Sequence, residues 1–210
     1  MCRLAGHASG ARLITGGRRA MLSGGTLQLA PPPPAHGDFR KMVSMAKKTK
    51  GKKSGAATAA VALLTETNTP FQMREYEHTE GVTSFGEEAA KNLGASEEQV
   101  FKTLLIVHEK DFAVAIVPVS GKLNIKAAAA ALGWKNASMC DPKVAERRTG
   151  YVVGGISPLG QKTPSPTLLD ESAQLFDTIM VSGGKRGLDV ELAPDDLLKL
   201  TNGKYADIRA

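Results

Sequence analysis

Two runs of apolar residues separated by a short polar segment predict a β-hairpin. The first run extends from Phe101 to Val107 and the second from Phe112 to Val119. Both are rich in the branched aliphatic side chains that strands favour. Residues 109–111 between them are polar and few, which suits a tight turn between antiparallel strands. We therefore expect these two strands to pair directly.

Shorter apolar runs predict further strands, and apolar residues that recur at helical spacing predict short helices. The other predicted strands cover residues 71–76, 151–153, 178–181, 188–192 and 206–208. The predicted helices cover residues 56–64, 84–93, 125–132, 142–148 and 194–200, with a helical turn at 96–99. Ser84 and Glu87 have the spacing of a capping box, and Asp141 precedes a proline at a first helical position.

The irregular mixture of strands and short helices indicates an α+β fold. We expect a single domain in which a mixed, partly closed, barrel-like sheet is surrounded by short helices. Two glycine-rich segments, residues 154–160 and 182–187, are expected to form loops.

Residues 1–54 lack the pattern of a folded core, so the domain is expected to span residues 55–210 and the extension to be disordered or spurious. Four prolines at 31–34 exclude helix there. Two interpretations stay open: the first 37 residues contain arginines and no acid, as transit peptides do, or translation begins at Met45. The lysine-rich run 47–53 is either a solvated leader or an arm that touches RNA phosphates.

The net positive charge of the chain comes from this extension. The formal net charge is +6, but residues 1–53 hold 11 of the 27 Lys and Arg and only one of the 21 acids. The remaining 16 basic and 20 acidic residues make the predicted domain mildly acidic. Since contacts to phosphates supply most non-specific affinity for nucleic acid, we expect the domain to bind RNA only modestly by itself.

Several classes of protein are excluded by what the sequence lacks. Cys2 and Cys140 are the only cysteines, which excludes a disulfide framework or a cysteine-rich zinc site and favours a reducing compartment. No apolar stretch approaches the length of a membrane span. Gln161 stands where a nucleotide-binding Walker motif requires lysine. We therefore expect a cytoplasmic protein without metal or cofactor.

Lys102 is the candidate for chemistry that the strand pattern itself identifies. Alternation places it on one face of its strand with Leu104 and Ile106, opposite Thr103. A lysine on an apolar face is costly unless its ammonium reaches water, a partner or a ligand. Lys102 therefore either binds a ligand or extends its charge to water at the strand end.

Conventional hydrolytic machinery is scarce in the domain. His78 and His108 are its only histidines, no Gly-x-Ser-x-Gly elbow is present, and Cys140 lies outside any protease signature. The segment 154–160 is either an ordinary connector or a ligand-binding loop. In the second case its glycines would let backbone amides approach a ligand, and Ser157 would add a hydroxyl.

Three short motifs occur in order along the domain: FKTL at residues 101–104, YVVGGISPLGQK at 151–162 and SGGKRGL at 182–188. Together they resemble the YbaK-type (or EbsC-type) Cys-tRNA(Pro) deacylases, a family related to the editing domain of bacterial prolyl-tRNA synthetases. Order and spacing agree through roughly residues 56–208. The second motif is more similar to this branch than to its alanyl-specific relatives.

The resemblance implies a site. It gives catalytic roles to Lys102, which would anchor the tRNA 3′ end or the substrate, and to Gly154 and Gly155, whose backbone would face the reactive ester. The expected substrate-binding residues are aromatic or polar: Tyr76, Phe85, Thr103, Ser157, Ser182 and Asp189.

The resemblance also implies a reaction. Such a trans-editing hydrolase deacylates mischarged Cys-tRNA(Pro), and the thiol of the substrate cysteine attacks the ester, in a lyase-like cyclisation, while the protein supplies position and electrostatics. The implied partners are tRNA(Pro) and prolyl-tRNA synthetase. A deacylase for tRNA mischarged with alanine or serine, and a non-catalytic module that binds tRNA or a synthetase, remain alternatives.

Overall fold

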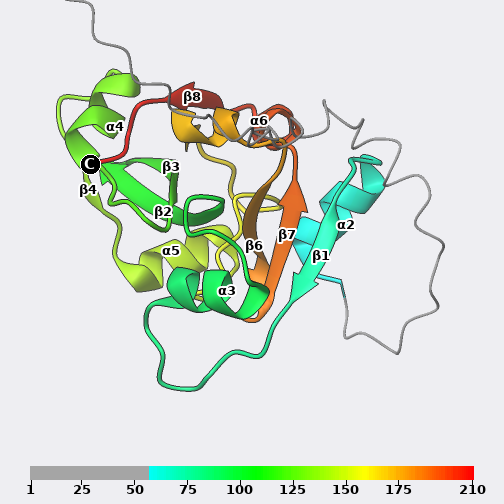
Figure 1. Ribbon diagram of the computed structural model, residues 1–210. Coiled ribbons are helices and arrows are strands. Elements are labelled where there is room, and N and C mark those ends of the chain that lie inside the picture. The colour runs from blue at the N-terminus through cyan, green and yellow to red at the C-terminus, as the bar shows by residue number, and fades with distance from the viewer. Residues whose placement is uncertain (1–56) are drawn as a thin grey trace, which may run out of the picture. The chain divides into compact units, whose positions relative to one another are not determined.

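Most of the elements predicted from periodicity are present in the computed structural model (Figure 1). It describes residues 57–210, so the expectations for residues 1–54 lie outside the described residues. The helices are α2 (Ala59–Glu66), α3 (Phe85–Leu93), α4 (Ile125–Ala131), α5 (Pro142–Thr149) and α6 (Pro194–Thr201), with a 3-10 turn η1 (Glu171–Leu175). The strands are β1 (Gln72–Glu75), β2 (Val100–His108), β3 (Asp111–Pro118), β4 (Ser138–Met139), β5 (Thr167–Asp170), β6 (Ile179–Lys185), β7 (Leu188–Leu192) and β8 (Lys204–Ala206).

The strands form one mixed sheet in the order β1-β7-β6-β2-β3-β5-β8, with β4 paired to β2. The predicted hairpin is confirmed: β2 and β3 are antiparallel, from His108 opposite Asp111 to Phe101 opposite Pro118. β2 pairs with β6 in parallel, and β3 with β5, so the hairpin lies in the middle of the sheet. The α+β class is confirmed, and within residues 57–210 the sheet stays open because β1 and β8 are its two edges.

Alternation along β2 divides its side chains between two apolar clusters. Phe101 and Leu105 are buried in the larger cluster with β6, β7 and α2, whereas Ile106 belongs to the cluster between β3 and α4. Leu104 packs against that second cluster, as the strand pattern predicts. Lys102 extends from the same face as Leu104, between that cluster and a third one in which Val100 is buried against α3.

Local sequence fixes the helix ends that border this region. Asp141 caps α5, because its Oδ1 accepts hydrogen bonds from the amides of Lys143 (2.9 Å) and Val144 (3.2 Å). Ser84 is the residue before α3, but its side chain makes no capping hydrogen bond. Gly94 ends that helix with a φ of +64°, where the lack of a Cβ avoids strain.

Two expectations about secondary structure were wrong, and two strands were not predicted. Residues 151–153 form no strand, since the chain turns there and the amide of Gly155 donates to Val152 O (2.9 Å). Residues 182–187 are not simply a loop: β6 continues through Gly183 and Gly184 with a register shift before Lys185. Strands β4 and β5 were missed, because β4 has two residues and all four residues of β5 are buried, which leaves no alternation.

No helix among residues 57–210 has both the length and the apolar character needed to cross a bilayer.

Candidate active site

A cavity of about 420 Å³ opens between β2, α3, α5, the segment 153–156 and the strands β6 and β7. It contains seven of the nine residues that the sequence indicated: Tyr76, Phe85, Lys102, Thr103, Gly154, Ser182 and Asp189. These residues come from positions 76 to 189, so only the folded sheet brings them together. Most of the remaining lining is apolar, which suits a site that excludes water around a few polar groups.

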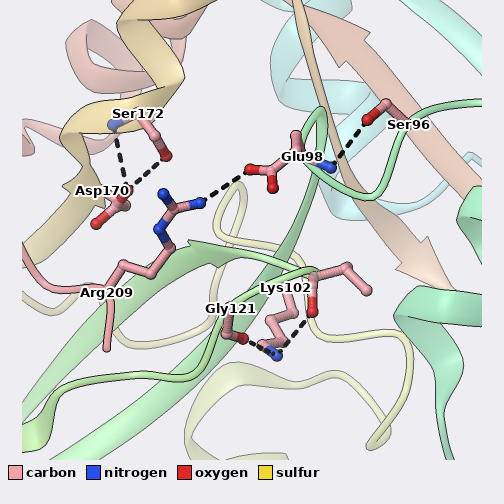
Figure 2. Close-up of polar contacts among 8 residues, drawn as sticks. Ser96, Glu98, Lys102, Gly121, Asp170, Ser172 and Arg209 are labelled. Atoms are coloured by element: carbon pink, nitrogen blue, oxygen red, sulfur yellow. Dashed lines mark hydrogen bonds and ion pairs between the residues drawn. The ribbon is translucent and has the colours of Figure 1, made fainter.

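The ammonium of Lys102, which lines this cavity, is held by backbone carbonyls. Its Nζ donates to the carbonyl oxygen of Gly121 at 2.7 Å and to that of Val119 at 3.4 Å, as Figure 2 shows for Gly121. Desolvation lowers the pKa of Lys102, while the carboxylates of Glu87 and Glu97 act in the opposite direction. With two of its three N–H groups bound to carbonyls, the ammonium has one donor left for a ligand.

The C-terminal residues hold the segment that positions Lys102. Arg209 lies across Gly121, where an added Cβ would come within 2.5 Å of the arginine Cδ. Its Nη1 donates to Glu98 Oε2 at 2.9 Å (Figure 2). Nearby, the amide of Ala210 donates to Lys122 O at 2.8 Å. Sequence reasoning missed this support, because Arg209 and Glu98 are 111 residues apart and no local pattern relates them.

Asp189 presents a carboxylate to the cavity from β7, which β6 separates from the strand of Lys102. The residue is 5% exposed, and none of the described residues donates a hydrogen bond to its side chain. Burial raises its pKa to about 6. Burial, followed by the charge of Asp189, also raises the pKa of Tyr76 to about 12, so this phenol stays neutral. A buried carboxylate without a partner is a binding group for a cation.

Phe85 forms the wall beside the glycine loop. Gly154 has a φ of +86°, and a Cβ there would lie 2.7 Å from the Phe85 ring, so the ring packs directly on the loop backbone. The loop is tied to α5 because Glu146 Oε1 accepts from the amide of Val153 at 2.8 Å. Thr103 also lines the cavity, and its buried hydroxyl has no hydrogen-bond partner among the described residues.

The structure does not bring Gly155 and Ser157 into the cavity lining. The amide of Gly155 is already bound to Val152 O, and a Cβ there would meet the backbone of Lys185 at 2.9 Å. Ser157 is fully buried, and its Oγ accepts from the amide of Leu159 at 3.2 Å. Both residues therefore shape the loop. Gly155 fits against the backbone of Lys185, and the hydroxyl of Ser157 is hydrogen-bonded inside the loop.

Cys140 also lines the cavity, which the sequence did not indicate. Burial raises the pKa of its thiol, and the adjacent Asp141 carboxylate acts in the same direction. A raised pKa disfavours the thiolate that a nucleophilic cysteine needs. In the described part of the chain, no three His, Cys, Asp or Glu side chains are grouped so as to hold a metal ion.

Comparisons with known proteins identify relatives of this domain. The family model named "Aminoacyl-tRNA editing domain" matches residues 79–200. A curated protein of Enterococcus faecalis, "Putative Cys-tRNA(Pro)/Cys-tRNA(Cys) deacylase EbsC", is 40% identical over 158 residues, covering 75% of this chain and 96% of that protein. A solved structure described as "a putative trans-editing enzyme for prolyl tRNA synthetase" is 26% identical with a TM-score of 0.64, covering 74% of this chain and 99% of the other. Another solved structure, a hypothetical protein at 22% identity and a TM-score of 0.66, covers 72% of this chain and 99% of its own and shares the fold.

Proposed function

The chain belongs to the aminoacyl-tRNA editing domain family, and from this premise we propose that it is a trans-acting hydrolase that removes cysteine from mischarged Cys-tRNA(Pro). One observation carries the proposal. The cavity combines a held ammonium, Lys102, with an unpartnered buried carboxylate, Asp189, and its lining includes no nucleophile paired with a base. Such a site is suited to holding a substrate that carries its own nucleophile.

The two charged groups bind opposite ends of the aminoacyl group in this proposal. The α-ammonium of the substrate, whose ordinary pKa is about 8, binds the Asp189 carboxylate. The free N–H of Lys102 points to the ester carbonyl and stabilises the negative charge that develops on its oxygen during attack. Tyr76 and Phe85 supply apolar walls that exclude water and strengthen both interactions.

The thiol of the bound cysteine performs the attack. Its sulfur forms a bond to the ester carbonyl carbon, the bond from that carbon to the ribose oxygen breaks, and the thiol proton passes to the departing oxygen. The tRNA leaves with a free hydroxyl, and water then hydrolyses the cyclic thioester to cysteine. The protein contributes mainly by holding sulfur and carbonyl close together, which is worth several powers of ten in rate.

Prolyl-tRNA synthetase is the proposed partner for tRNA selection. The domain carries 16 basic and 20 acidic residues over positions 54–210, so its own attraction for tRNA phosphates is weak. The solved relative is described as "a putative trans-editing enzyme for prolyl tRNA synthetase", which supports the same arrangement for this chain.

We expect the purified protein to remove cysteine from tRNA(Pro) at least tenfold faster than it removes alanine, serine or proline from the same tRNA. The reason is that only cysteine carries a thiol at the required distance. The measurement is loss of radiolabelled amino acid from each charged tRNA, with Cys-tRNA(Cys) included to test tRNA selectivity. Equal rates for Cys-tRNA(Pro) and Ser-tRNA(Pro) would contradict the thiol-assisted mechanism, and binding without turnover of any substrate would contradict an enzyme.

We expect Cys140→Ser to deacylate Cys-tRNA(Pro) within about threefold of the wild-type rate. Cys140 lines the cavity, but its pKa is raised and the proposed nucleophile belongs to the substrate. Single-turnover kinetics with excess protein measure the chemical step directly. A loss of two powers of ten, with an unchanged melting temperature, would transfer the nucleophilic role from the substrate to the protein.

A further inference from the structure

Arg186 lies at the turn between β6 and β7, outside the set of residues that the sequence indicated. We propose that its guanidinium binds the 5′-phosphate of the tRNA nucleotide that carries the aminoacyl ester. This inference rests on the proposed function, because it assumes that an aminoacylated tRNA end occupies the cavity. It adds a phosphate subsite at the rim of that cavity.

The guanidinium is fixed at the rim by two contacts. Its Nε donates to the carbonyl oxygen of Val153 at 2.9 Å, and its Cζ lies 4.9 Å from the centroid of the Phe85 ring. Val153 and Phe85 both line the cavity. Val153 is itself held by Glu146 through its amide, so Arg186 is anchored to a backbone segment that α5 keeps in place.

The turn that carries Arg186 is also held closely. Gly187 has a φ of +76°, and a Cβ there would lie 2.7 Å from the carbonyl oxygen of Tyr76. A Cβ on Gly155 would lie 3.0 Å from the amide nitrogen of Arg186. Backbone therefore packs on backbone on both sides of the arginine, which limits the conformational freedom that binding a ligand would otherwise have to remove.

The remaining donors of Arg186 suit a phosphate. The residue is exposed, and among residues 57–210 neither Nη atom has a hydrogen-bond partner. With Nε bound to Val153, the free edge of the guanidinium presents two parallel N–H groups. This edge matches two oxygens of a phosphate, whereas an ammonium would offer only a point charge.

Charge and burial place the phosphate at the rim and not inside. The lining already contains two acidic residues, Glu87 and Asp189, and Lys102 is its only basic residue. A phosphate drawn into this apolar space would lose water and meet both carboxylates. One ribose separates the ester from the 5′-phosphate of the same nucleotide, so an ester inside the cavity leaves that phosphate near the opening, where Arg186 is held.

The test is a binding cycle with two stable analogues of the charged end. One is 3′-deoxy-3′-(cysteinylamino)adenosine, in which an amide replaces the ester, and the other is the same compound with a 5′-phosphate. Isothermal titration calorimetry gives Kd for both compounds with the wild-type protein and with Arg186→Gln. We expect the wild type to bind the phosphorylated compound at least tenfold more tightly, and Arg186→Gln to bind the two with the same affinity.

Two variants control for charge and for geometry. Arg147 is exposed on α5 outside the lining, so Arg147→Gln removes the same charge and is expected to keep the preference for the phosphate. Arg186→Lys keeps the charge but loses the flat edge and is expected to retain only part of the preference. Melting temperatures verify that each variant is folded.

The outcomes separate this inference from the proposed function. Equal affinity of the wild type for both compounds would overturn the phosphate subsite and leave the proposed function standing. A preference that survives in Arg186→Gln would assign the phosphate to another residue and also overturn the inference. Absence of binding by either compound to the folded wild type would overturn the proposed function, and this inference with it.

Discussion

Replacing Lys102 with methionine is expected to lower kcat/KM for Cys-tRNA(Pro) by about 10²- to 10³-fold, the usual effect of removing one preorganised donor from a developing oxyanion. Methionine keeps most of the apolar stem on β2 and removes only the ammonium. Because that ammonium is partly desolvated in the folded protein, we expect the free energy of unfolding to change by no more than about 1 kcal/mol. Single-turnover deacylation and thermal unfolding measure the two effects separately.

Lys122 supplies the matched control for this experiment. It is an exposed lysine one residue after Gly121, and its charge acts on Lys102, but it does not line the cavity. We expect Lys122→Met to keep the deacylation rate within about threefold. Full activity of Lys102→Met would remove the ammonium from the mechanism, and equal losses in both variants would indicate a general effect of charge on tRNA binding.

The elements that the sequence predicted well carry strong local signals. The strands of the β2–β3 hairpin are long apolar runs separated by a short polar turn, helix α5 begins with a cap and a proline, and the limits of all three agree to within one or two residues. Strand β5 shows no alternation because all of its residues are buried. Strand β6 extends through Gly183 and Gly184, where a side chain would collide with Leu188 or Tyr151, so glycine there reflects close packing and not a loop.

The site was predicted unevenly for a similar reason. Lys102 was identified because a charge on an apolar strand face is locally anomalous, and the other residues followed from the motifs. Arg186 and Arg209 were missed because each acts through a contact with a distant segment: Val153 lies 33 residues from Arg186, and Glu98 lies 111 residues from Arg209. Exposed arginines carry no local signal that distinguishes these contacts from solvation.

Asp189 is the residue at which stability and activity are expected to change in opposite directions. Its pKa is about 6 in the folded protein, against 3.8 for an ordinary aspartate, so the folded chain binds this proton more tightly than the unfolded chain does. Stability due to this group is therefore full below about pH 4, falls as pH rises from 4 to 6, and stays reduced above 6. Above pH 6, the ionised Asp189 carboxylate lowers the free energy of unfolding by up to about 3 kcal/mol relative to its value below pH 4.

We expect Asp189→Asn to raise the free energy of unfolding at pH 8 by up to about 3 kcal/mol and to leave it nearly unchanged at pH 4. Chemical denaturation at several pH values measures this difference. The exposed residue Asp177 provides the control, and Asp177→Asn is expected to show no such rise. An equal gain at pH 4 and pH 8 would mean that the asparagine packs better and that ionisation is not the cause.

The same variant is expected to lose about 10- to 100-fold in kcat/KM at pH 7.5, because an amide cannot pair with the α-ammonium as a carboxylate does. Wild-type kcat/KM should rise with pH through about 6 as Asp189 ionises, and this step should be absent from Asp189→Asn. A more stable protein with lower activity would show that the buried carboxylate is kept for its ligand. Unchanged activity of Asp189→Asn, together with a retained step near pH 6, would mean that another group in the cavity binds the α-ammonium of the substrate.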